Sequence, residues 1–211
     1  EVICFPHGDV HQLASSADLK PTMPTEAIVA LTRADEVVSV THGGGGSTNN
    51  GPNPNSGTLS GQQVFVAGNT PHSLTLSSSG GHLYTANLND STVSQFNVNG
   101  ATLTQLAPAV GTGTTPNQVV LHPNGQVLFT ADQATNTVTR FTVGANGALT
   151  ANGIAHQFAG GNGTNGMGFT NNPAGAGNQF AYVVNYFGSN VQAFTSDAAG
   201  NLTAVGAPIT T

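Results

Sequence analysis

Hydrophobic and polar residues alternate in short runs along most of the chain, and the alternation recurs in three related segments. These segments are LYTANLNDSTVSQFNV (residues 83–98), LFTADQATNTVTRFTV (128–143) and AYVVNYFGSNVQAFTS (181–196). Each contains an alternating run, a polar turn and a second alternating run with an aromatic residue near its end. A period of two is typical of a β-strand with one buried face. Each segment therefore predicts a β-hairpin.

The spacing of the segments defines a repeat. Tyr84 and Phe129 are 45 residues apart, and Phe129 and Tyr182 are 53 residues apart. The eight additional residues match the segment NNPAGAGN (171–178), which is predicted to be a longer surface loop. A strand repeat of this length, without a helical pattern, predicts a propeller blade or a related array.

Turn signals divide each repeat into four strands. Asn-Gly, Gly-Gly and Gly-Asn pairs separate the runs, and glycine adopts the positive φ angles of tight turns at little steric cost. The predicted strands are 73–76, 83–86, 92–98 and 103–106, then 118–121, 127–131, 137–143 and 149–151, and finally 167–170, 180–184, 191–195 and 202–205. The sequence therefore predicts an all-β β-propeller of four-stranded antiparallel blades.

The N-terminal part carries a degenerate copy of this unit. Residues 27–32 (AIVALT) and 36–41 (EVVSVT) predict a hairpin, and residues 1–5 and 11–15 predict further short strands. Residues 43–56 (GGGGSTNNGPNPNS) form a low-complexity loop. The prediction is one domain over residues 1–211 with about four blades, at 9–66, 71–110, 115–158 and 164–211, and with residues 1–8 closing a ring or pairing with a neighbour.

The charge of the chain excludes several partners. Only 6% of its 211 residues are charged, with 3 Lys and Arg against 9 Asp and Glu. Nucleic acids and anionic membrane surfaces select for clustered Lys and Arg, so neither is an expected partner. No run of 18 apolar residues occurs, and no membrane insertion is predicted.

Composition favours an extracellular protein. The single cysteine, Cys4, excludes a disulfide framework within the chain. A β protein that is rich in Thr, Asn and Gly and poor in charge suits secretion or a cell surface. Three N-x-[ST] sequons begin at Asn89, Asn162 and Asn201, in predicted turns or loops, and these are candidate glycosylation sites.

The three hairpin segments also resemble a known repeat. Together with the lead-ins PHSL and PNQVVLHPNGQ and the outer strand GALT, they are similar to the repeat of the YVTN/lactonase-like (6-phosphogluconolactonase-like) β-propellers. The resemblance covers residues 57–211 well and the first 56 residues loosely. It implies a seven-bladed fold, whereas this chain supplies about four blades.

Because the chain supplies fewer than seven blades, its exposed sheet edges could be protected in several ways. Four blades could close as a small propeller, two chains could combine into a larger ring, or the chain could belong to a longer or cleaved product. An open array with edges paired between subunits is a further option. The expected partner is thus another copy, which associates through sheet edges or termini, and a small-molecule or glycan ligand is also compatible.

Histidines at the starts of the predicted inner strands are the candidates for catalysis. In the lactonases that the chain resembles, His, Glu and Arg side chains in the channel are the usual candidates. Lactone hydrolysis needs a group that activates water and a donor that stabilises the oxyanion. His11 and His72 occupy equivalent places, and Arg33 is the candidate anion-stabilising residue. Arg140 lies inside a repeat strand and is interpreted as a surface residue.

The remaining polar positions are given structural interpretations. The third and fourth units carry Asn117 and either Asn165 or Gly166 where the second carries His72. Residues Asn87, Asp132 and Asn185 each end a strand and are interpreted as Asx-turn acceptors for nearby backbone N–H groups.

Metal and cofactor chemistry has little support in the sequence. Cys4, His7 and His11 form a C-x2-H-x3-H cluster that could hold zinc or copper, but no second cluster completes a ligand set. The cluster is therefore interpreted as a strand end followed by a turn. No cofactor is predicted.

Three functions remain as hypotheses. The preferred one is a secreted, non-enzymatic propeller protein that acts in self-assembly, surface structure or binding. The alternatives are a lactonase-like hydrolase of a small lactone and a carbohydrate-binding propeller. Convergence of His11, His72 and an arginine in a channel would favour the hydrolase, whereas dispersal of these residues would favour assembly.

Overall fold

The computed structural model describes residues 27–32, 36–41, 60–159, 163–170 and 179–210. The predicted strands at 1–5 and 11–15 and the predicted loops at 43–56 and 171–178 lie outside the described residues. The prediction that residues 1–211 form one domain with the stated blade boundaries therefore stays a prediction.

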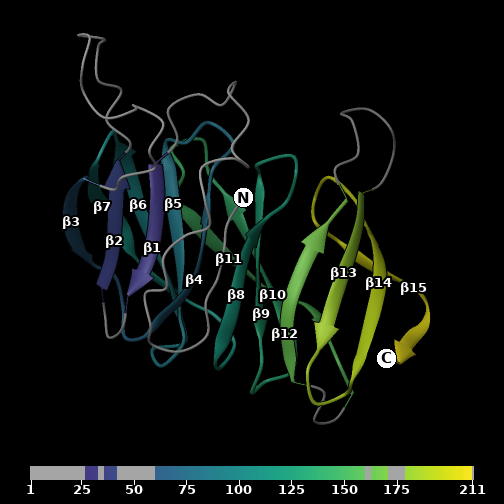
Figure 1. Cartoon of the computed structure of the whole chain (residues 1–211). Helices are drawn as coiled ribbons and strands as arrows, with labels where there is room; N and C mark the ends of the chain where they lie inside the picture. The colour runs from purple at the N-terminus through teal and green to yellow at the C-terminus, as the bar shows by residue number, and fades with distance from the viewer. Residues whose placement is uncertain (1–26, 33–35, 42–59, 160–162, 171–178, 211) are drawn as a thin grey trace, which may run out of the picture.

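The described residues fold into four antiparallel sheets, each made of strands that follow one another in sequence (Figure 1). The first blade contains β1 (Ala27–Thr32), β2 (Glu36–Thr41) and β3 (Ser60–Val66), and the second contains β4 (Pro71–Leu76), β5 (His82–Asn87), β6 (Thr92–Asn99) and β7 (Thr102–Gly111). The third contains β8 (Pro116–Leu121), β9 (Val127–Asp132), β10 (Thr137–Val143) and β11 (Leu149–Gln157), and the fourth contains β12 (Thr164–Phe169), β13 (Gln179–Asn185), β14 (Asn190–Ser196) and β15 (Leu202–Thr210). The predicted all-β fold is confirmed, and the second, third and fourth blades are four-stranded antiparallel sheets as predicted.

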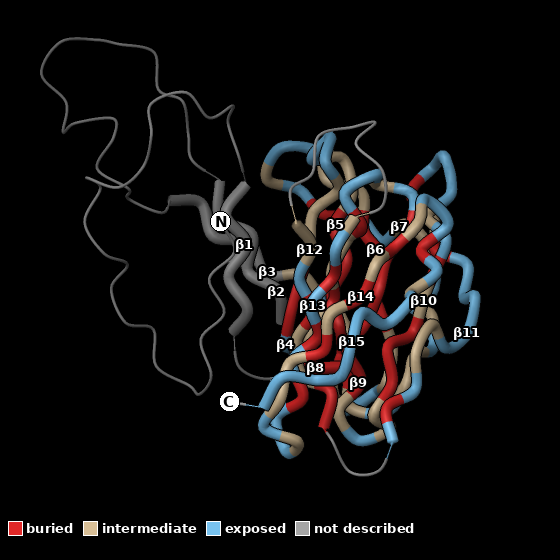
Figure 2. The backbone as a smooth tube through the Cα atoms, turned by 90° about the vertical axis from the view of Figure 1, so that its right-hand side faces the viewer, coloured by how far each residue is buried: buried red, intermediate tan, exposed pale blue. Residues whose placement is uncertain are grey.

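The fourth strands of the blades are longer than predicted. β7, β11 and β15 reach Gly111, Gln157 and Thr210, well past the predicted ends at residues 106, 151 and 205. These strands lie at sheet edges, so most of their residues are exposed and carry no hydrophobic alternation (Figure 2). Register shifts interrupt the pairing of each with its neighbour. A bulge changes the face of the sheet on which the following side chains lie. The alternation of hydrophobic and polar residues is then interrupted, and the strand cannot be recognised from it.

The hydrophobic core lies between blades. β4, β8 and β12 lie side by side as the inner strands, and each blade packs one face on the next blade. One cluster joins the second and third blades through Tyr84, Ala86, Val93, Val119, Leu128, Phe141 and Leu149. A second joins the third and fourth through Val127, Phe129, Val138, Phe158, Met167, Ala181, Val183 and Phe194. Every residue of β9 is buried because this strand is covered on both faces.

Candidate active site

A β-bulge stands at the same place in each inner strand. The pairing of β4 with β5, of β8 with β9 and of β12 with β13 shifts by one residue at the second position of the inner strand. His72, Asn117 and Asn165 occupy this position. A bulge releases one residue from the ladder and re-aims its side chain, and bulges are frequent next to active sites. The repeat therefore presents one polar side chain per blade at the starts of neighbouring inner strands.

His72 is held by the next blade. Its Nδ1 atom lies 2.8 Å from the backbone oxygen of Asn117. A carbonyl can only accept, so Nδ1 carries the proton, and the lone pair of the neutral imidazole is on Nε2. His72 is exposed, whereas Asn117 is buried and Asn165 is half-buried. An exposed imidazole with a fixed tautomer can take a proton from water.

Polar side chains lock the inner strands together beside this position. Ser73 Oγ accepts a hydrogen bond from the Val119 backbone N–H at 3.1 Å. At the equivalent place one blade later, Gln118 Oε1 accepts from the Met167 backbone N–H. These bonds fix the spacing between the strands that carry His72 and its partner. The fourth blade has Gly166 at this place and no side chain to continue the series.

Asp132 is a buried carboxylate directly behind the inner strands. It is inaccessible to solvent, and Oδ2 accepts hydrogen bonds from Thr139 Oγ1 at 2.6 Å and Thr137 Oγ1 at 3.1 Å. Thr112 Oγ1 donates to Oδ1 at 3.0 Å. Burial raises the pKa of Asp132, and the threonine hydroxyl groups counteract part of this rise. Its hydrogen bonds make Asp132 a structural residue.

Asn87 performs the same task in the second blade. Its Oδ1 accepts from the Gly68 backbone N–H at 3.1 Å, and its Nδ2 donates to Ser94 Oγ at 2.8 Å and Thr92 Oγ1 at 3.0 Å. These partners differ from the local Asx-turn predicted for this position. The bonds go to the next strand and to a segment 19 residues away, because the sheet brings distant polar groups to a side chain that is fully buried.

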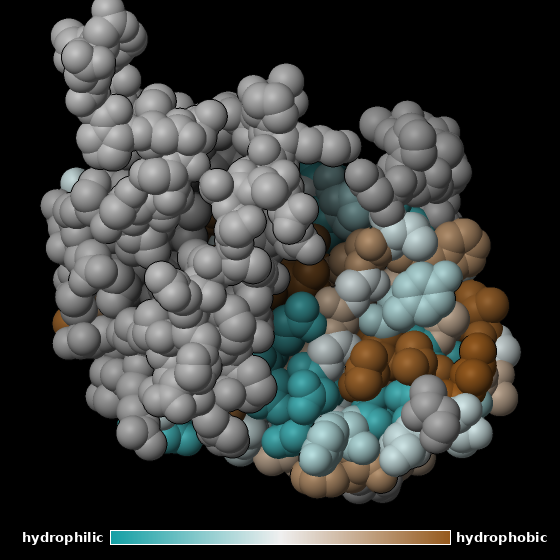
Figure 3. All heavy atoms as spheres, in the orientation of Figure 1, coloured by the Kyte–Doolittle hydropathy of each residue, from teal (hydrophilic) through white to brown (hydrophobic). Residues whose placement is uncertain are grey.

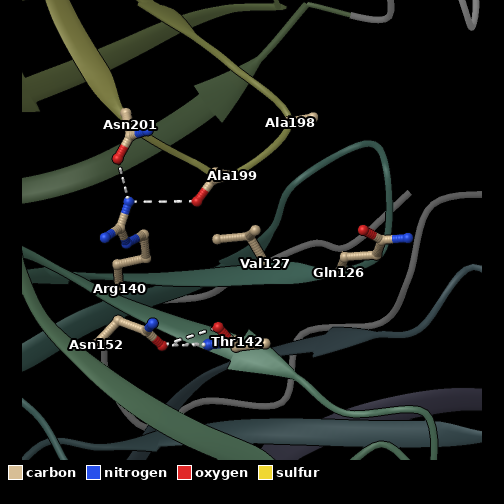
Figure 4. Close-up of a pocket in the computed structure, with 8 residues that line it drawn as sticks. All are labelled: Gln126, Val127, Arg140, Thr142, Asn152, Ala198, Ala199 and Asn201. Carbon is tan, nitrogen blue, oxygen red and sulfur yellow. Dashed lines mark hydrogen bonds between the residues drawn. The ribbon is translucent and has the colours of Figure 1, made fainter.

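The Arg140 side chain contacts the fourth blade (Figure 4). Its Nη1 donates to Asn201 Oδ1 at 2.6 Å and to the Ala199 backbone oxygen at 3.2 Å. Both acceptors belong to the turn between β14 and β15. Arg140 therefore joins two blades and is not part of a site with His72.

The structure describes only some of the predicted site residues. His72 lies beside Asn117, but His11 and Arg33 lie outside the described residues, so their convergence with His72 stays a prediction. The same holds for the metal candidates Cys4 and His7. In the described ranges, no group of three or more His, Cys, Asp or Glu side chains could hold a metal.

Two of the three sequon asparagines are described. Asn89 Nδ2 donates to Thr70 Oγ1 at 2.7 Å, and Asn201 Nδ2 donates to Asp197 Oδ2 at 2.8 Å. Both asparagines are exposed. Asn162 lies outside the described residues. Use of any sequon stays a prediction.

Sequence reasoning missed the polar residues that clamp adjacent blades. Gln95 Oε1 accepts from the Leu149 backbone N–H at 2.7 Å, at the position that Arg140 occupies one repeat later. Both residues lie in the third strand of their blade, where polar and apolar residues alternate. A polar residue at the same repeat position in two blades was the available signal, but its partner is 54 residues away and only the packed blades reveal it.

Comparison with known proteins agrees with this architecture. Residues 37–168, more than half of the chain, match the family described as lactonase, 7-bladed beta-propeller. The chain belongs to this family. No curated protein matches the sequence.

Solved structures with the same fold include several proteins named for lactonase activity. A Bacteroides fragilis protein assigned as a 6-phosphogluconolactonase aligns with a TM-score of 0.63 at 19% identity, over 95% of this chain and 59% of that chain. The periplasmic gluconolactonase of Pseudomonas aeruginosa aligns with a TM-score of 0.60 at 20% identity, over 87% of this chain and 56% of that one. Hydrazine synthase of Kuenenia stuttgartiensis aligns with a TM-score of 0.52 at 13% identity, over 81% and 44%.

These likenesses at low identity establish the fold. This lactonase-family chain spans less than two thirds of each of these solved structures. The expectation of a lactonase-like propeller from the hairpin repeat is confirmed. Family membership favours the hydrolase alternative over the non-enzymatic hypothesis that the sequence alone preferred.

Proposed function

We propose that this lactonase-family chain hydrolyses a small sugar lactone at the starts of its inner strands. The observation that supports the proposal is the contact between His72 Nδ1 and the Asn117 backbone oxygen, 2.8 Å long. That contact leaves Nε2 as the acceptor on an exposed imidazole. Structural relatives named as gluconolactonases supply the substrate class.

The reaction that fits this arrangement is general-base hydrolysis. His72 Nε2 accepts a proton from water, and the water oxygen attacks the lactone carbonyl carbon. The amide of Asn165, at the equivalent position of β12 on the far side of β8 from His72, is the candidate donor to the oxyanion. When the ring C–O bond breaks, the imidazolium returns its proton to the leaving alkoxide, and the product is a hydroxy acid.

Replacement of His72 by Asn tests the proposal without disturbing the fold. Asn stands at the equivalent bulge position in the third and fourth blades, so β4 can accommodate it. With δ-gluconolactone as substrate, we expect His72→Asn to lower kcat/KM about 100-fold or more, measured as the rate of proton release.

Arg140→Gln is the matched control. Gln is the residue of the second blade at this repeat position, and Arg140 contacts Ala199 and Asn201 instead of the inner strands. We expect this variant to keep the wild-type rate within about twofold. A wild-type chain that does not accelerate hydrolysis, or equal rates for wild type and His72→Asn, would refute the proposal.

Binding of a sugar without turnover is the second candidate function. The three bulge positions of the inner strands carry one imidazole and two amides, Asn117 and Asn165, and no carboxylate or guanidinium. Amides donate and accept hydrogen bonds and suit hydroxyl-rich ligands. Titration calorimetry with gluconate separates the two candidates, because a binding protein would retain the ligand and leave δ-gluconolactone intact.

Export from the cytoplasm is part of the proposal. The relative from Pseudomonas aeruginosa is named as a periplasmic protein, and the chain has low charge and three sequons. No helix that could span a membrane occurs in the ranges that the structure describes. Detection of the protein in the culture supernatant or periplasmic fraction of its source, and not in its cytoplasm, is the expected result.

A further inference from the structure

The pair Asn-Gly occurs seven times in this chain, and it can react without any enzyme. The backbone nitrogen of the glycine attacks the side-chain Cγ of the asparagine, and the side-chain nitrogen leaves as ammonia with the proton of the attacking nitrogen. Water then opens the resulting succinimide ring to either aspartate or isoaspartate. Glycine permits the attack because it carries no side chain that would obstruct it.

Five of the seven pairs lie wholly within the described residues, and their hydrogen bonds determine how easily each can react. Attack requires a side chain that is free to rotate and a glycine N–H that no acceptor holds. Restraint of either group makes the reactive arrangement rarer. The five pairs begin at Asn99, Asn124, Asn146, Asn152 and Asn165.

Asn124-Gly125 is held at both reacting groups, in the turn between β8 and β9. The Gly125 N–H donates to the His122 backbone oxygen at 2.8 Å. Asn124 Oδ1 accepts from the Gln126 N–H at 2.9 Å, and Nδ2 donates to the Ala198 backbone oxygen at 2.8 Å. The side chain of Asn124 therefore cannot turn toward Gly125 without losing hydrogen bonds.

Asn146-Gly147 is held in the same way, in the turn between β10 and β11. The Gly147 N–H donates to the Gly144 backbone oxygen at 2.9 Å. Asn146 Oδ1 accepts from the Ala148 N–H at 3.1 Å. A Cβ at Gly147 would lie 2.5 Å from the His82 ring, so this turn has little room to move.

The two pairs inside strands are held by the sheet. Asn152 Oδ1 accepts from the Thr142 N–H at 2.8 Å and from the Thr142 hydroxyl at 2.9 Å. Asn165 is half-buried, and Gly166 is paired with Val184 of β13. Both pairs would have to leave a strand before they could react.

Asn99-Gly100 has none of these restraints. Gly100 and Ala101 form the two-residue loop that joins Asn99 at the end of β6 to its partner Thr102 in β7. Gly100 has φ +58°, as expected for the first central residue of a type II′ turn, whose hydrogen bond leaves the N–H of this residue unused. Among the described residues, no hydrogen bond holds the Gly100 N–H or the Asn99 side chain, and both residues are exposed.

We propose that Asn99 is the site at which the folded chain deamidates fastest, with isoaspartate and aspartate as products in the β6–β7 turn. Attack also requires rotation of the Asn99 backbone, which opens the pair of Asn99 with Thr102. This pair is the last of its ladder, and the ends of ladders open at low cost. A Cβ at Gly100 would meet nothing within 4 Å, so the loop has room for the movement. The turn lies at the opposite end of the second blade from His72, because successive strands are antiparallel, so the proposal does not depend on the proposed hydrolysis.

Deamidation of Asn99 changes the outer part of the second blade and the charge of the chain. Isoaspartate continues the main chain through its side chain and so lengthens a loop whose length fixes the register of β6 and β7. Either product adds a carboxylate to a chain in which only 6% of residues are charged. Hydrophobic side chains gather even on the exposed surface of the fourth blade (Figure 3). Modified chains should therefore separate from unmodified chains in anion-exchange chromatography.

Incubation of the whole chain at pH 8 tests the proposal. Digestion with pepsin at acid pH stops the reaction, and tandem mass spectrometry measures the conversion at each of the five described pairs over time. We expect Asn99 to react about tenfold faster than each of the other four, because loss of one or two ordinary hydrogen bonds makes their reactive arrangement that much rarer. Enzymatic methylation of isoaspartate should label the peptide that contains residue 99.

Unfolding and one variant supply the controls. In urea above the unfolding transition the hydrogen bonds of the fold are lost, so the rates at the five pairs should agree within about threefold. Asn99→Gln changes an exposed side chain and should retain the circular dichroism spectrum, and it should remove the most rapidly formed acidic species. Equal rates in the folded chain, a faster reaction at another of the five pairs, or the same advantage of Asn99 in urea would each overturn the proposal.

Discussion

Tyr84 of the second blade donates its hydroxyl proton to the backbone oxygen of Gly147 in the third, at 2.7 Å. The tyrosine has no solvent exposure, and Gly147 has φ +82°. A Cβ at Gly147 would lie 2.5 Å from the His82 ring, so only glycine permits this approach. The Tyr84 hydroxyl thus joins the second and third blades, in addition to the hydrogen bonds that Ser73 and Gln95 accept from the third blade.

Replacement of Tyr84 by Phe should weaken this junction. The ring would still fill its site, as Phe129 does in the third blade, but the Gly147 carbonyl would lose a buried partner. We expect the free energy of unfolding to fall by about 1 kcal/mol in urea titrations at pH 8. Tyr186→Phe, on an exposed ring, is the control and should leave the midpoint unchanged.

The same variant should remove a loss of stability at alkaline pH. Burial raises the pKa of Tyr84 to about 12 from 10.0. The unfolded chain therefore loses this proton first, and the contribution of Tyr84 to stability decreases as pH rises from about 10 to 12. The difference in unfolding free energy between wild type and Tyr84→Phe should shrink across that range. A constant difference would contradict the assignment.

Asp132→Asn should change how stability depends on acid. Burial raises the pKa of Asp132, so the native chain binds this proton more readily than the unfolded chain. The buried, charged carboxylate therefore lowers the stability of the wild type at neutral pH. The wild type regains this stability as pH falls through the raised pKa toward 3.8, the ordinary pKa of an aspartate. Asn cannot titrate and is the natural residue at the equivalent positions 87 and 185. We expect a gain of about 1 kcal/mol at pH 7 that disappears toward pH 4, measured by chemical denaturation.

Asp197→Asn is a control of opposite sign. Hydrogen bonds from the Asn201 side chain and backbone lower the pKa of Asp197. Its contribution to stability is therefore present above its unfolded pKa and decreases as pH falls. At pH 7 Asp132→Asn should be more stable than the wild type and Asp197→Asn less stable; the first difference should disappear toward pH 4, whereas the second should persist until the pH falls below 3.8. Parallel pH profiles of the two variants would show that burial does not raise the pKa of Asp132.

Gly113→Ala should destabilise the third blade. A Cβ at this position would lie 2.5 Å from both Asp132 Oδ2 and Thr135 Oγ1. These atoms belong to a packed hydrogen-bond network, so the added methyl group should cost about 1–3 kcal/mol in thermal or urea unfolding. Gly111→Ala is the matched control, because a Cβ there meets nothing within 4 Å. Equal stabilities of the two variants would contradict the close approach of residue 113 to the side chains of Asp132 and Thr135.

In the second, third and fourth blades, the inner three strands were predictable, and the fourth strand was predictable only in part. Hairpins such as β9 and β10 follow from local alternation, because a one-residue shift would expose their hydrophobic side chains. β11 was predicted to end near residue 151 but reaches Gln157. Its exposed face and its bulges leave no periodic signal, and backbone pairing with β10 determines its length.

The candidate site was predictable as a set of positions. The repeat places His72, Asn117 and Asn165 at equivalent starts of inner strands, and the structure adds the bulge and the bond from Nδ1 to the Asn117 oxygen. The role of Arg140 as a clamp between blades was not predictable in this detail, since its acceptors Ala199 and Asn201 are about 60 residues away. Local sequence cannot specify which distant carbonyl a long side chain reaches.

By itself the sequence determined the structure of one blade. The alternation of polar and apolar residues, the glycine turns and the repeat of 45 to 53 residues suffice to predict a four-stranded blade and to identify its family. Only the tertiary structure decided what each blade face meets. Tyr84 and Tyr182 hold the same place in the repeat, yet one is fully buried and the other is 45% exposed. Burial depends on the neighbouring blade and not on the residues within a blade, because hydrophobic free energy is gained only when a second surface displaces water.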